Sequence, residues 1–337
     1  MSIKIAINGM GRIGRTAFKI AFDRNNTEIV AVNDLTDPKL IAYLTQHDSV
    51  YGAWKNKVAG NEKELIVNDK KIPYFQEPAP EKLPWKDLGV DVVLECTGVF
   101  TKSEKAGLHL DAGAKLVILS APPKSDDIKI LLIGCNEKEF SPEKHKIISN
   151  ASCTTNCLAP VIKVLNDEFG VEQALMTTVH SYTASQALVD GPAKDTREAR
   201  AAALNIIPST TGAAIAVTKV LPELEGKFTG MAVRVPSPVV SASDLVAKLK
   251  QKVSAEKVNN AFIAASTTSM KGVLAVTNEE LVSTDFKQNP NSSIVDLNLT
   301  MVIGEDMVKV FAWYDNEWGY SERLIDLAEY TGSKISS

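Results

Sequence analysis

A glycine-rich turn between a strand-like and a helix-like segment limits the fold of this chain more than any other feature. Residues 2–8 (SIKIAIN) are rich in β-branched side chains, and residues 12–24 place apolar side chains at helical spacing. Between them, Gly9, Gly11 and Gly14 follow the GxGxxG spacing. In that motif the first glycine permits a tight turn, the second lets a pyrophosphate approach the backbone, and the third lets the helix pack closely on the strand. Because a helix start also offers free N–H groups to phosphates, this segment predicts a dinucleotide-binding unit rather than a purely structural turn.

An acidic residue after the next predicted strand indicates which dinucleotide is bound. The strand at 28–33 (EIVAVN) leads into Asp34, 20 residues after Gly14. A carboxylate at this place accepts hydrogen bonds from a ribose 2′-hydroxyl and repels a 2′-phosphate. We therefore expect NAD rather than NADP as the cofactor.

The first 150 residues alternate strand and helix patterns. A helix is expected over 37–46, an antiparallel hairpin around Asn68-Asp69, and strands buried on both faces at 90–96, 115–120 and 146–150. Strands that alternate with helices favour an α/β fold with a doubly wound, mostly parallel sheet.

The pattern changes after residue 170. Longer segments with partial period-two patterning predict a larger antiparallel or mixed sheet at 171–183, 229–238, 243–250 and 306–315. Helices that would cover one face of this sheet are expected at 152–169, 211–220 and 254–266, and another at the C-terminus. The second half is thus expected to be an α+β domain, with the boundary near residue 150.

Length and composition exclude several classes of protein. A chain of 337 residues with 45% hydrophobic and 23% charged residues has the balance of a globular protein with two domains. The net charge of −4, without a long basic run, argues against a dedicated nucleic-acid binder. No apolar run is long enough to span a bilayer, and the N-terminus lacks a signal-peptide pattern. Four cysteines in a chain of this length favour reduced thiols and a cytoplasmic location.

The stretch SNASCTTNCLA at 149–159 carries the main candidate for chemistry. Ser152 is an N-cap type of residue, so Cys153 is expected in the first turn of a helix, where the helix dipole lowers the pKa of a thiol. Cys157 lies on the same helical face, but the CxxxC spacing differs from the two-residue spacing of common redox and zinc motifs. A redox disulfide and a metal site are therefore weaker interpretations than one reactive thiol beside a buried Cys157.

Among the histidines, His180 is the candidate base. It ends the predicted strand VEQALMTTVH, although a lone histidine is more often structural. Cys96 and Cys135 have apolar, strand-like neighbours and are expected in the core. No function is assigned to His47, His109 or His145, and His109 is expected on a solvated helix end.

Six segments together resemble phosphorylating, NAD-dependent glyceraldehyde-3-phosphate dehydrogenases of type I: NGMGRIGR, ASCTTNCLAP, HSYTASQALVDGPAKD, NIIPSTTGAA, MAVRVPSP and WYDNEWGYS. They cover essentially the whole chain in the order and spacing of that family. The resemblance implies that Cys153 is the nucleophile and His180 the base. It also implies that D-glyceraldehyde 3-phosphate is oxidised with NAD and inorganic phosphate to 1,3-bisphosphoglycerate through a cysteine thioester, as a step of glycolysis.

The resemblance also assigns binding residues. Those implied for the substrate phosphate are Thr183 and Arg234, with Arg197 nearby, and those for the attacking phosphate are Ser152, Thr154, Thr211 and Gly212. Those implied for NAD are Gly9, Gly11, Arg12, Ile13, Gly14, Asp34, Ser120 and Asn316, and no metal ligand is expected. The chain departs from the family at Pro78-Ala79, where Arg-Asp is frequent, and this affects the expected contact with the adenine.

The resemblance further implies a homotetramer, with residues 181–203 in a subunit interface. It places the C-terminal segment 317–337 with the first domain. The expected domains are therefore a Rossmann-type NAD-binding domain of residues 1–151 with 317–337, and a catalytic domain of residues 152–316.

Other functions remain open at this point. Erythrose-4-phosphate dehydrogenase is the nearest alternative, and the intact STTGAA segment argues against it because that segment is implied to hold the attacking phosphate. Aspartate-semialdehyde dehydrogenase shares the thioester chemistry but has different substrate motifs. A surface-binding protein is an alternative of another class, for which the chain shows no added domain or basic tail.

Overall fold

The computed structural model describes residues 2–193 and 195–335, and its contacts divide the chain into two compact units. Within the described residues, the first unit takes 2–132, 137–151 and 321–335. The second unit takes 133–136 and 152–320. Residues 1, 194, 336 and 337, which fall within the expected domains and interface segment, lie outside the described residues.

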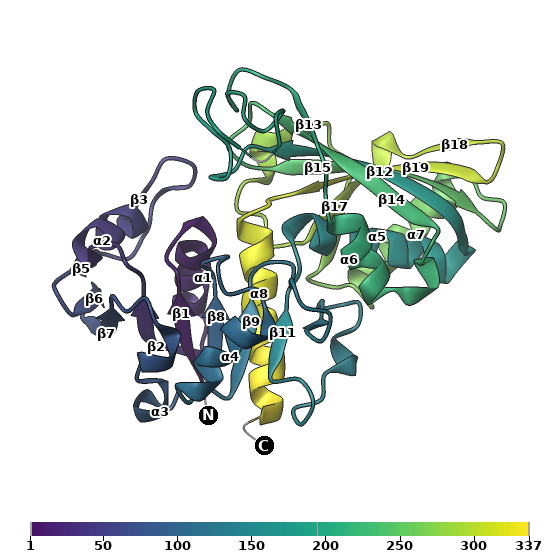
Figure 1. Cartoon of the computed structure of the whole chain (residues 1–337). Coiled ribbons are helices and arrows are strands. Elements are labelled where there is room, and N and C mark those ends of the chain that lie inside the picture. The colour runs from purple at the N-terminus through teal and green to yellow at the C-terminus, as the bar shows by residue number, and fades with distance from the viewer. Residues whose placement is uncertain (1, 194, 336–337) are drawn as a thin grey trace. The chain divides into compact units, whose positions relative to one another are not determined.

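The first unit is built on a sheet whose strand order, among the described residues, is β10-β11-β9-β8-β1-β2-β7-β6-β5 (Figure 1). Its central strands are β1 (Ile3–Asn8), β2 (Thr27–Asn33), β7 (Lys70–Phe75), β8 (Val92–Glu95), β9 (Leu116–Leu119), β11 (Ile147–Ser149) and β10 (Lys129–Ile130). All of these pair in parallel, whereas β6 (Glu64–Val67) and β5 (Val58–Gly60) extend the sheet antiparallel. The predicted doubly wound parallel sheet is confirmed.

Helices connect the parallel strands of the first unit. They are α1 (Arg12–Asp23), α2 (Pro38–Gln46), α3 (Trp85–Leu88) and α4 (Ser103–Asp111), with 3₁₀ turns at Pro80–Lys82 and Glu137–Glu139 and a small ribbon of β3 (His47–Asp48) and β4 (Gly52–Ala53). The start of α2 shows why the sequence folds this way, because Asp37 accepts a hydrogen bond from the backbone N–H of Lys39 and Pro38 occupies the first turn.

The long C-terminal helix α8 (Trp318–Ile335) contributes its residues from 321 onward to the first unit. Arg24 forms ion pairs there with Glu322 at 2.6 Å, Asp326 at 2.9 Å and Glu329 at 3.3 Å. A single cation that holds three carboxylates successively one turn apart aligns this helix along the unit.

The second unit contains a mixed sheet with the order β13-β14-β12-β15-β19-β17-β16 among the described residues. Its strands are β13 (Ile207–Ser209), β14 (Phe228–Val235), β12 (Val171–Ser181), β15 (Ser241–Leu249), β19 (Met307–Tyr314), β17 (Ser293–Asp296) and β16 (Leu274–Thr277), and β18 (Met301–Ile303) pairs with β19. Most pairs are antiparallel, but β12–β14 and β16–β17 are parallel. The parallel register of β12 and β14 places His180 directly opposite Arg234.

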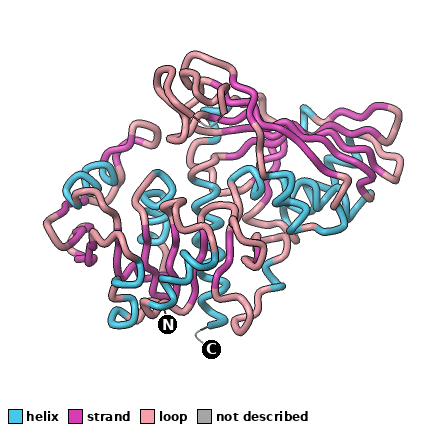
Figure 2. The backbone as a smooth tube through the Cα atoms, viewed as in Figure 1, coloured by secondary structure: helices cyan, strands magenta, loops and turns pink. Residues whose placement is uncertain are grey.

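One face of this sheet is covered by helices, as the sequence predicts. Contacts to the strands are made by α5 (Cys153–Phe169), α6 (Ala213–Val220) and α7 (Ala255–Thr267), and short 3₁₀ turns lie at Pro222–Leu224, Ser283–Phe286 and Leu297–Leu299. Figure 2 shows the described residues between β12 and β13, 182–193 and 195–206, as loops and turns. Among the described residues, no helix combines the length and the apolar character that a membrane span requires.

Candidate active site

Cys153 is the first residue of α5, and Ser152 caps that helix. The Ser152 hydroxyl accepts a hydrogen bond from the backbone N–H of Thr155 at 3.2 Å. A cap of this kind contributes about 1 kcal/mol to helix stability. The cap therefore holds the cysteine sulfur at the helix start, where the sequence predicts it.

His180 lies against this thiol. Its Nε2 is 3.4 Å from Cys153 Sγ, although 27 residues separate the two in sequence. The imidazole is buried near the end of β12, and its plane makes an angle of 73° with the Tyr314 ring at a centroid distance of 6.0 Å. The fold thus brings the predicted nucleophile and the predicted base into contact.

Arg234 approaches the other side of the imidazole. Its Nη1 is 2.5 Å from His180 Nδ1 and donates to the Ser181 carbonyl at 3.1 Å. The same carbonyl lies 2.7 Å from Nδ1 and can accept its proton. The guanidinium and the imidazole therefore compete for one acceptor.

This environment determines the charge of the base. Burial, assisted by the positive charge of Arg234, lowers the pKa of His180 to about 3. The imidazole is therefore neutral near pH 7 and able to accept a proton.

The pKa of the Cys153 thiol is raised, whereas its place at the helix start predicted a lowered pKa. Burial raises the pKa of Cys153, and this outweighs the opposing effects of Arg234 and of hydrogen bonds from Thr154 and the helix-start amides. The sequence interpretation of a lowered pKa was wrong because it counted the dipole and omitted desolvation. A thiol of this kind needs a proton acceptor when it attacks, and His180 is in place.

Tyr314 is a part of the site that the sequence interpretation missed. Its hydroxyl, fully buried, lies 3.0 Å from Thr154 Oγ1 and 2.8 Å from Thr178 Oγ1. Burial raises its pKa well above the usual value, so it stays a neutral phenol beneath the thiol. The sequence WYDNEW contains no local signal for this role, because the contacts come from three separate elements.

The residues expected around the two phosphates lie on different segments of the second unit. Thr154 follows Cys153 in the first turn of α5, and its hydroxyl lies 3.0 Å from the Tyr314 hydroxyl. Thr211 and Gly212 precede α6, where the Thr211 hydroxyl accepts from the N–H of Ala213 at 3.1 Å. Thr183 Oγ1 contacts Ser185 Oγ at 2.9 Å in the following loop.

Arg197 lies in the loop between β12 and β13 and is exposed. Its backbone N–H donates to the Asp195 carboxylate at 2.7 Å. The described contacts do not join its side chain to Cys153 or His180.

The glycine-rich loop forms part of a cavity of about 460 Å³ in the first unit. Gly9 has φ +96°, and a Cβ on Gly14 would lie 1.9 Å from the Gly9 carbonyl oxygen, so neither position admits a side chain. A Cβ on Gly11 would meet nothing within 4 Å, which leaves the backbone open to a ligand. These features fit the pyrophosphate of a dinucleotide at the start of α1.

Asp34 also lines this cavity and is already oriented. Its Oδ2 accepts from the N–H of Met10 at 2.6 Å and its Oδ1 from the N–H of Thr36 at 2.9 Å. These two bonds leave other lone pairs of the carboxylate for a ribose hydroxyl. Leu35 and Pro78 line the same cavity. The position at which Pro78 differs from the residue frequent in the family is therefore part of the cavity lining.

Gly14 and four other expected cofactor residues lie outside that lining. Arg12 pairs with Asp48 at 2.7 Å, and Ile13 follows it in the first turn of α1. Ser120 follows β9 and donates its N–H to the Glu95 carbonyl at 3.0 Å. Asn316, in the second unit, accepts at Oδ1 from the hydroxyls of Ser181 at 2.8 Å and Ser241 at 3.1 Å.

Two interpretations of side chains outside the thiol site need correction. Cys96 and Cys135 are half-buried rather than core residues, and Cys96 lines the cavity. His109 is fully buried rather than solvated, because Trp85 and Glu95 occupy both of its ring nitrogens. Cys157 is fully buried, as expected. Within the described part of the chain, no group of three or more His, Cys, Asp or Glu could hold a metal ion.

We expect iodoacetamide at pH 7 to alkylate Cys153 faster than Cys96, Cys135 or Cys157. Burial raises the pKa of Cys96 and of Cys157 to about 12, whereas Arg234 and a neutral imidazole act on Cys153. The rate at Cys153 should increase with pH as the thiolate fraction grows. Mass spectrometry of peptides from timed reactions measures all four rates, and equal rates would contradict an activated Cys153.

The first unit has the parallel sheet and glycine-rich turn of a dinucleotide-binding domain, and the second unit holds a cysteine–histidine pair; these features fit the class of dehydrogenases. Comparison with known proteins agrees. The profile of the glyceraldehyde 3-phosphate dehydrogenase NAD binding domain matches residues 3–103, and that of the C-terminal domain of the same enzyme matches residues 152–316.

Full-length relatives carry the same name. The chain is 54% identical over 334 residues to glyceraldehyde-3-phosphate dehydrogenase of Geobacillus stearothermophilus and 53% identical over 334 residues to glyceraldehyde-3-phosphate dehydrogenase 1 of Bacillus subtilis, each covering 99% of both chains. It is 51% identical to the enzyme of Podospora anserina over 339 residues and the whole of both chains. The chain belongs to the glyceraldehyde-3-phosphate dehydrogenase family, and it is an NAD-dependent oxidoreductase of glycolysis that acts on a small-molecule substrate.

Proposed function

We propose that this enzyme oxidises D-glyceraldehyde 3-phosphate and phosphorylates the product through a thioester on Cys153. The contact of 3.4 Å between Cys153 Sγ and His180 Nε2 is the observation that carries the proposal. A thiol paired with a neutral imidazole is the arrangement that covalent catalysis on an aldehyde requires.

His180 moves the protons of the first half-reaction. It accepts the thiol proton as sulfur attacks the aldehyde carbon, and it returns that proton to the carbonyl oxygen to give a hemithioacetal. It then removes the hydroxyl proton while the hydride leaves from the same carbon. Bound NAD would supply the hydride acceptor, and a thioester would remain on Cys153.

The second half-reaction releases the product. Inorganic phosphate attacks the thioester carbon, the carbon–sulfur bond breaks, and the imidazolium of His180 protonates the departing sulfur. The products are 1,3-bisphosphoglycerate and the free thiol.

Arg234 and Thr183 are proposed to bind the substrate phosphate, and Arg197 is proposed to lie near it. A guanidinium binds phosphate oxygens through two parallel N–H donors. When Arg234 binds a phosphate, the Ser181 carbonyl is left to the Nδ1 proton of His180, and this directs the Nε2 lone pair toward the thiol. Ser152, the Thr154 N–H, Thr211 and Gly212 are proposed for the attacking phosphate.

The cofactor would be held by residues 1–151 together with 317–337, and the chemistry would be carried by residues 152–316. Gly9, Gly11, Gly14 and the N–H groups of Arg12 and Ile13 would take the pyrophosphate, and Asp34 the adenine ribose. Ser120 and Asn316 are proposed for the nicotinamide end.

Replacement of Asp34 by alanine should reduce discrimination against NADP. The carboxylate repels a 2′-phosphate and hydrogen-bonds a 2′-hydroxyl, so its loss should raise the KM for NAD and lower the KM for NADP. The measurement is the ratio of kcat/KM for the two cofactors. Asp37→Ala, which removes a nearby carboxylate used as a helix cap, is the matched control, and an unchanged ratio in Asp34→Ala would contradict the assignment.

We further propose a homotetramer in the cytoplasm. Exposed apolar side chains gather on the segment after β12 and on the strands of the second unit, namely Leu188, Val189, Leu204, Ile206, Leu175, Met231, Met301 and Ile303. Exposed apolar side chains that form a patch are typical of protein interfaces. Analytical ultracentrifugation tests the assembly, and a monomer at micromolar concentration would contradict it.

Phosphate-dependent reduction of NAD with D-glyceraldehyde 3-phosphate tests the proposed reaction. Erythrose 4-phosphate should be a much poorer substrate, and omission of phosphate should stop turnover after one equivalent of NADH. Preference for erythrose 4-phosphate without a need for phosphate would overturn the choice. A surface-binding role would be supported if Cys153→Ser abolished NADH formation without changing the cellular phenotype.

A further inference from the structure

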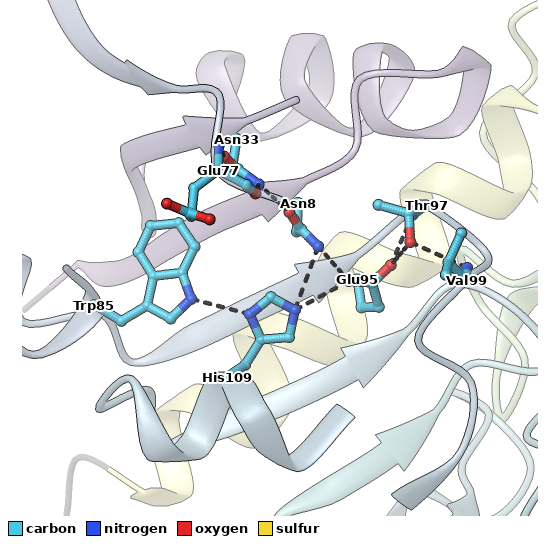
Figure 3. A network of polar contacts seen from close by, with 8 residues as sticks. All are labelled: Asn8, Asn33, Glu77, Trp85, Glu95, Thr97, Val99 and His109. Carbon is cyan, nitrogen blue, oxygen red and sulfur yellow. Dashed lines mark hydrogen bonds and ion pairs between the residues drawn. The ribbon is translucent and has the colours of Figure 1, made fainter. Parts of the chain in front are cut away.

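A buried polar chain crosses the carboxyl ends of four neighbouring strands in the first unit (Figure 3). Asn8 ends β1, Asn33 ends β2, Glu95 ends β8, and Glu77 follows β7. Asn8, Asn33 and Glu95 are no more than 4% exposed. The chain lies at the cofactor cavity, because Asn8, Asn33 and Glu77 line it together with Thr97 and Val99.

Backbone amides fix the direction of the hydrogen bonds at one end of this chain. The N–H of Glu77 donates to Asn33 Oδ1 at 2.9 Å, so Asn33 presents its Nδ2 to Asn8 Oδ1 at 2.7 Å. Asn8 must then present its own Nδ2 to Glu95, where it donates to Oε2 at 2.5 Å. The side-chain amides of Asn33 and Asn8 cannot be reversed, because a hydrogen-bond donor would then point at another donor.

An indole fixes the direction at the other end. Trp85 Nε1 donates to His109 Nδ1 at 3.0 Å, and since an indole N–H only donates, Nδ1 must carry the lone pair. The imidazole proton is therefore on Nε2, 3.0 Å from Glu95 Oε2. Figure 3 shows the His109 ring between the Trp85 indole and the Glu95 carboxylate.

The two ends meet on Glu95. Its Oε2 accepts hydrogen bonds from Asn8 and His109. Its Oε1 accepts hydrogen bonds from the Thr97 N–H at 2.8 Å and from the Thr97 hydroxyl. Because both oxygens face donors whose direction is fixed, Glu95 is a carboxylate beside a neutral His109. A buried anion held by four donors keeps its neighbours in place, since the loss of any one bond leaves a group unpaired in the interior.

Thr97 connects this anion to the glycine-rich loop. Any Cβ on Gly9 would lie 2.8 Å from the Thr97 N and Cγ2 atoms, so the loop rests directly on this residue. The Thr97 hydroxyl also accepts from the N–H of Val99 at 3.1 Å, and Val99 lines the cavity.

We propose that Glu95, held by His109 and Asn8, is a positioning residue for the adenosine half of NAD, because its carboxylate holds Thr97 against the Gly9 turn and fixes the spacing of the strand ends around the cavity. This inference rests on the proposed NAD site at Gly9, Gly11 and Asp34. It assigns a role in cofactor affinity to residues that would not touch the cofactor.

The test is Glu95→Gln in the full-length enzyme. The glutamine side chain has one acceptor atom and one donor atom. In either orientation of this amide, its NH₂ group points at a hydrogen-bond donor of Asn8, His109 or Thr97. The Kd for NAD, measured by titration calorimetry, should rise at least tenfold. The KM for NAD should rise in parallel, while kcat and the KM for the aldehyde stay within about twofold of wild type.

Two further variants separate positioning from general destabilisation. Thr97→Val keeps the methyl group against Gly9 and removes the hydroxyl, and the Kd for NAD should rise two- to fivefold with unchanged folding. Leu94→Ala empties a fully buried position of the same strand without removing a hydrogen bond, and should lower the melting temperature while the Kd stays within twofold.

Competition by adenosine monophosphate tests whether Glu95 affects the binding of the adenosine half of NAD. The inhibition constant of adenosine monophosphate should rise by the same factor as the Kd for NAD in Glu95→Gln. Wild-type affinity for NAD in both Glu95→Gln and Thr97→Val, or weaker binding of NAD with unchanged binding of adenosine monophosphate, would overturn the inference. An inactive wild-type enzyme would instead contradict the proposed function.

Discussion

Cys153→Ser should lower the rate of NADH formation by about 10⁴-fold or more, the scale of loss when a covalent nucleophile is removed. The hydroxyl is a much weaker nucleophile, and no thioester can form. Because Cys153 lies at a capped helix start, the substitution should leave the fold and the Kd for NAD unchanged. Stopped-flow measurement of NADH in the first turnover, together with calorimetric titration of NAD, checks both expectations.

Cys157→Ser is the matched control, since it removes the sulfur one helical turn further along the same helix. We expect it to retain most of the activity, with some loss of stability because the site is fully buried. Activity above about one per cent of wild type in Cys153→Ser, or equal losses in the two variants, would contradict the assignment of the nucleophile.

His180→Asn should lower kcat by about 10²- to 10⁴-fold, the range expected for loss of a general base. Alkylation of Cys153 by iodoacetamide should also slow, because the thiol loses the acceptor that lies 3.4 Å away. The pKa of His180 is lowered to about 3, so the imidazole becomes protonated only as the pH falls toward that value. The wild-type enzyme should therefore lose no activity through protonation of His180 between pH 5 and 8.

His47→Asn serves as the control, since His47 lies exposed at the end of α2. Its kcat should equal that of the wild type. A kcat within threefold of wild type for His180→Asn would contradict the role of the base.

Local patterns predicted much of the fold. The GxGxxG turn needs only short-range sterics, and the tight approach of Gly14 to the Gly9 carbonyl is the consequence expected from the spacing. The start of α5 at Cys153 followed from the Ser152 cap. The hairpin around Asn68 followed from the residue type, because Asn68 adopts a left-handed conformation with φ 52°.

Non-local features could not be predicted in this way. The sequence predicted an antiparallel or mixed sheet but not which strands pair in parallel, and the parallel pairing of β12 with β14 placed Arg234 opposite His180. Tyr314 reaches the site from β19, and nothing in its local sequence indicates contacts with Thr154 and Thr178. His109 was misplaced because its partners, Trp85 and Glu95, belong to other elements.

By itself the sequence determined where the turns and helix starts lie, and with them the glycine loop and the helix-start thiol. These features depend on backbone sterics and on hydrogen bonds between residues a few positions apart. Only the tertiary structure decided the protonation chemistry: the raised pKa of Cys153, the neutral His180 and the buried carboxylate of Glu95. Desolvation and hydrogen-bond direction depend on which distant side chains surround a group, and that is settled when the strands pair and the helices pack on them.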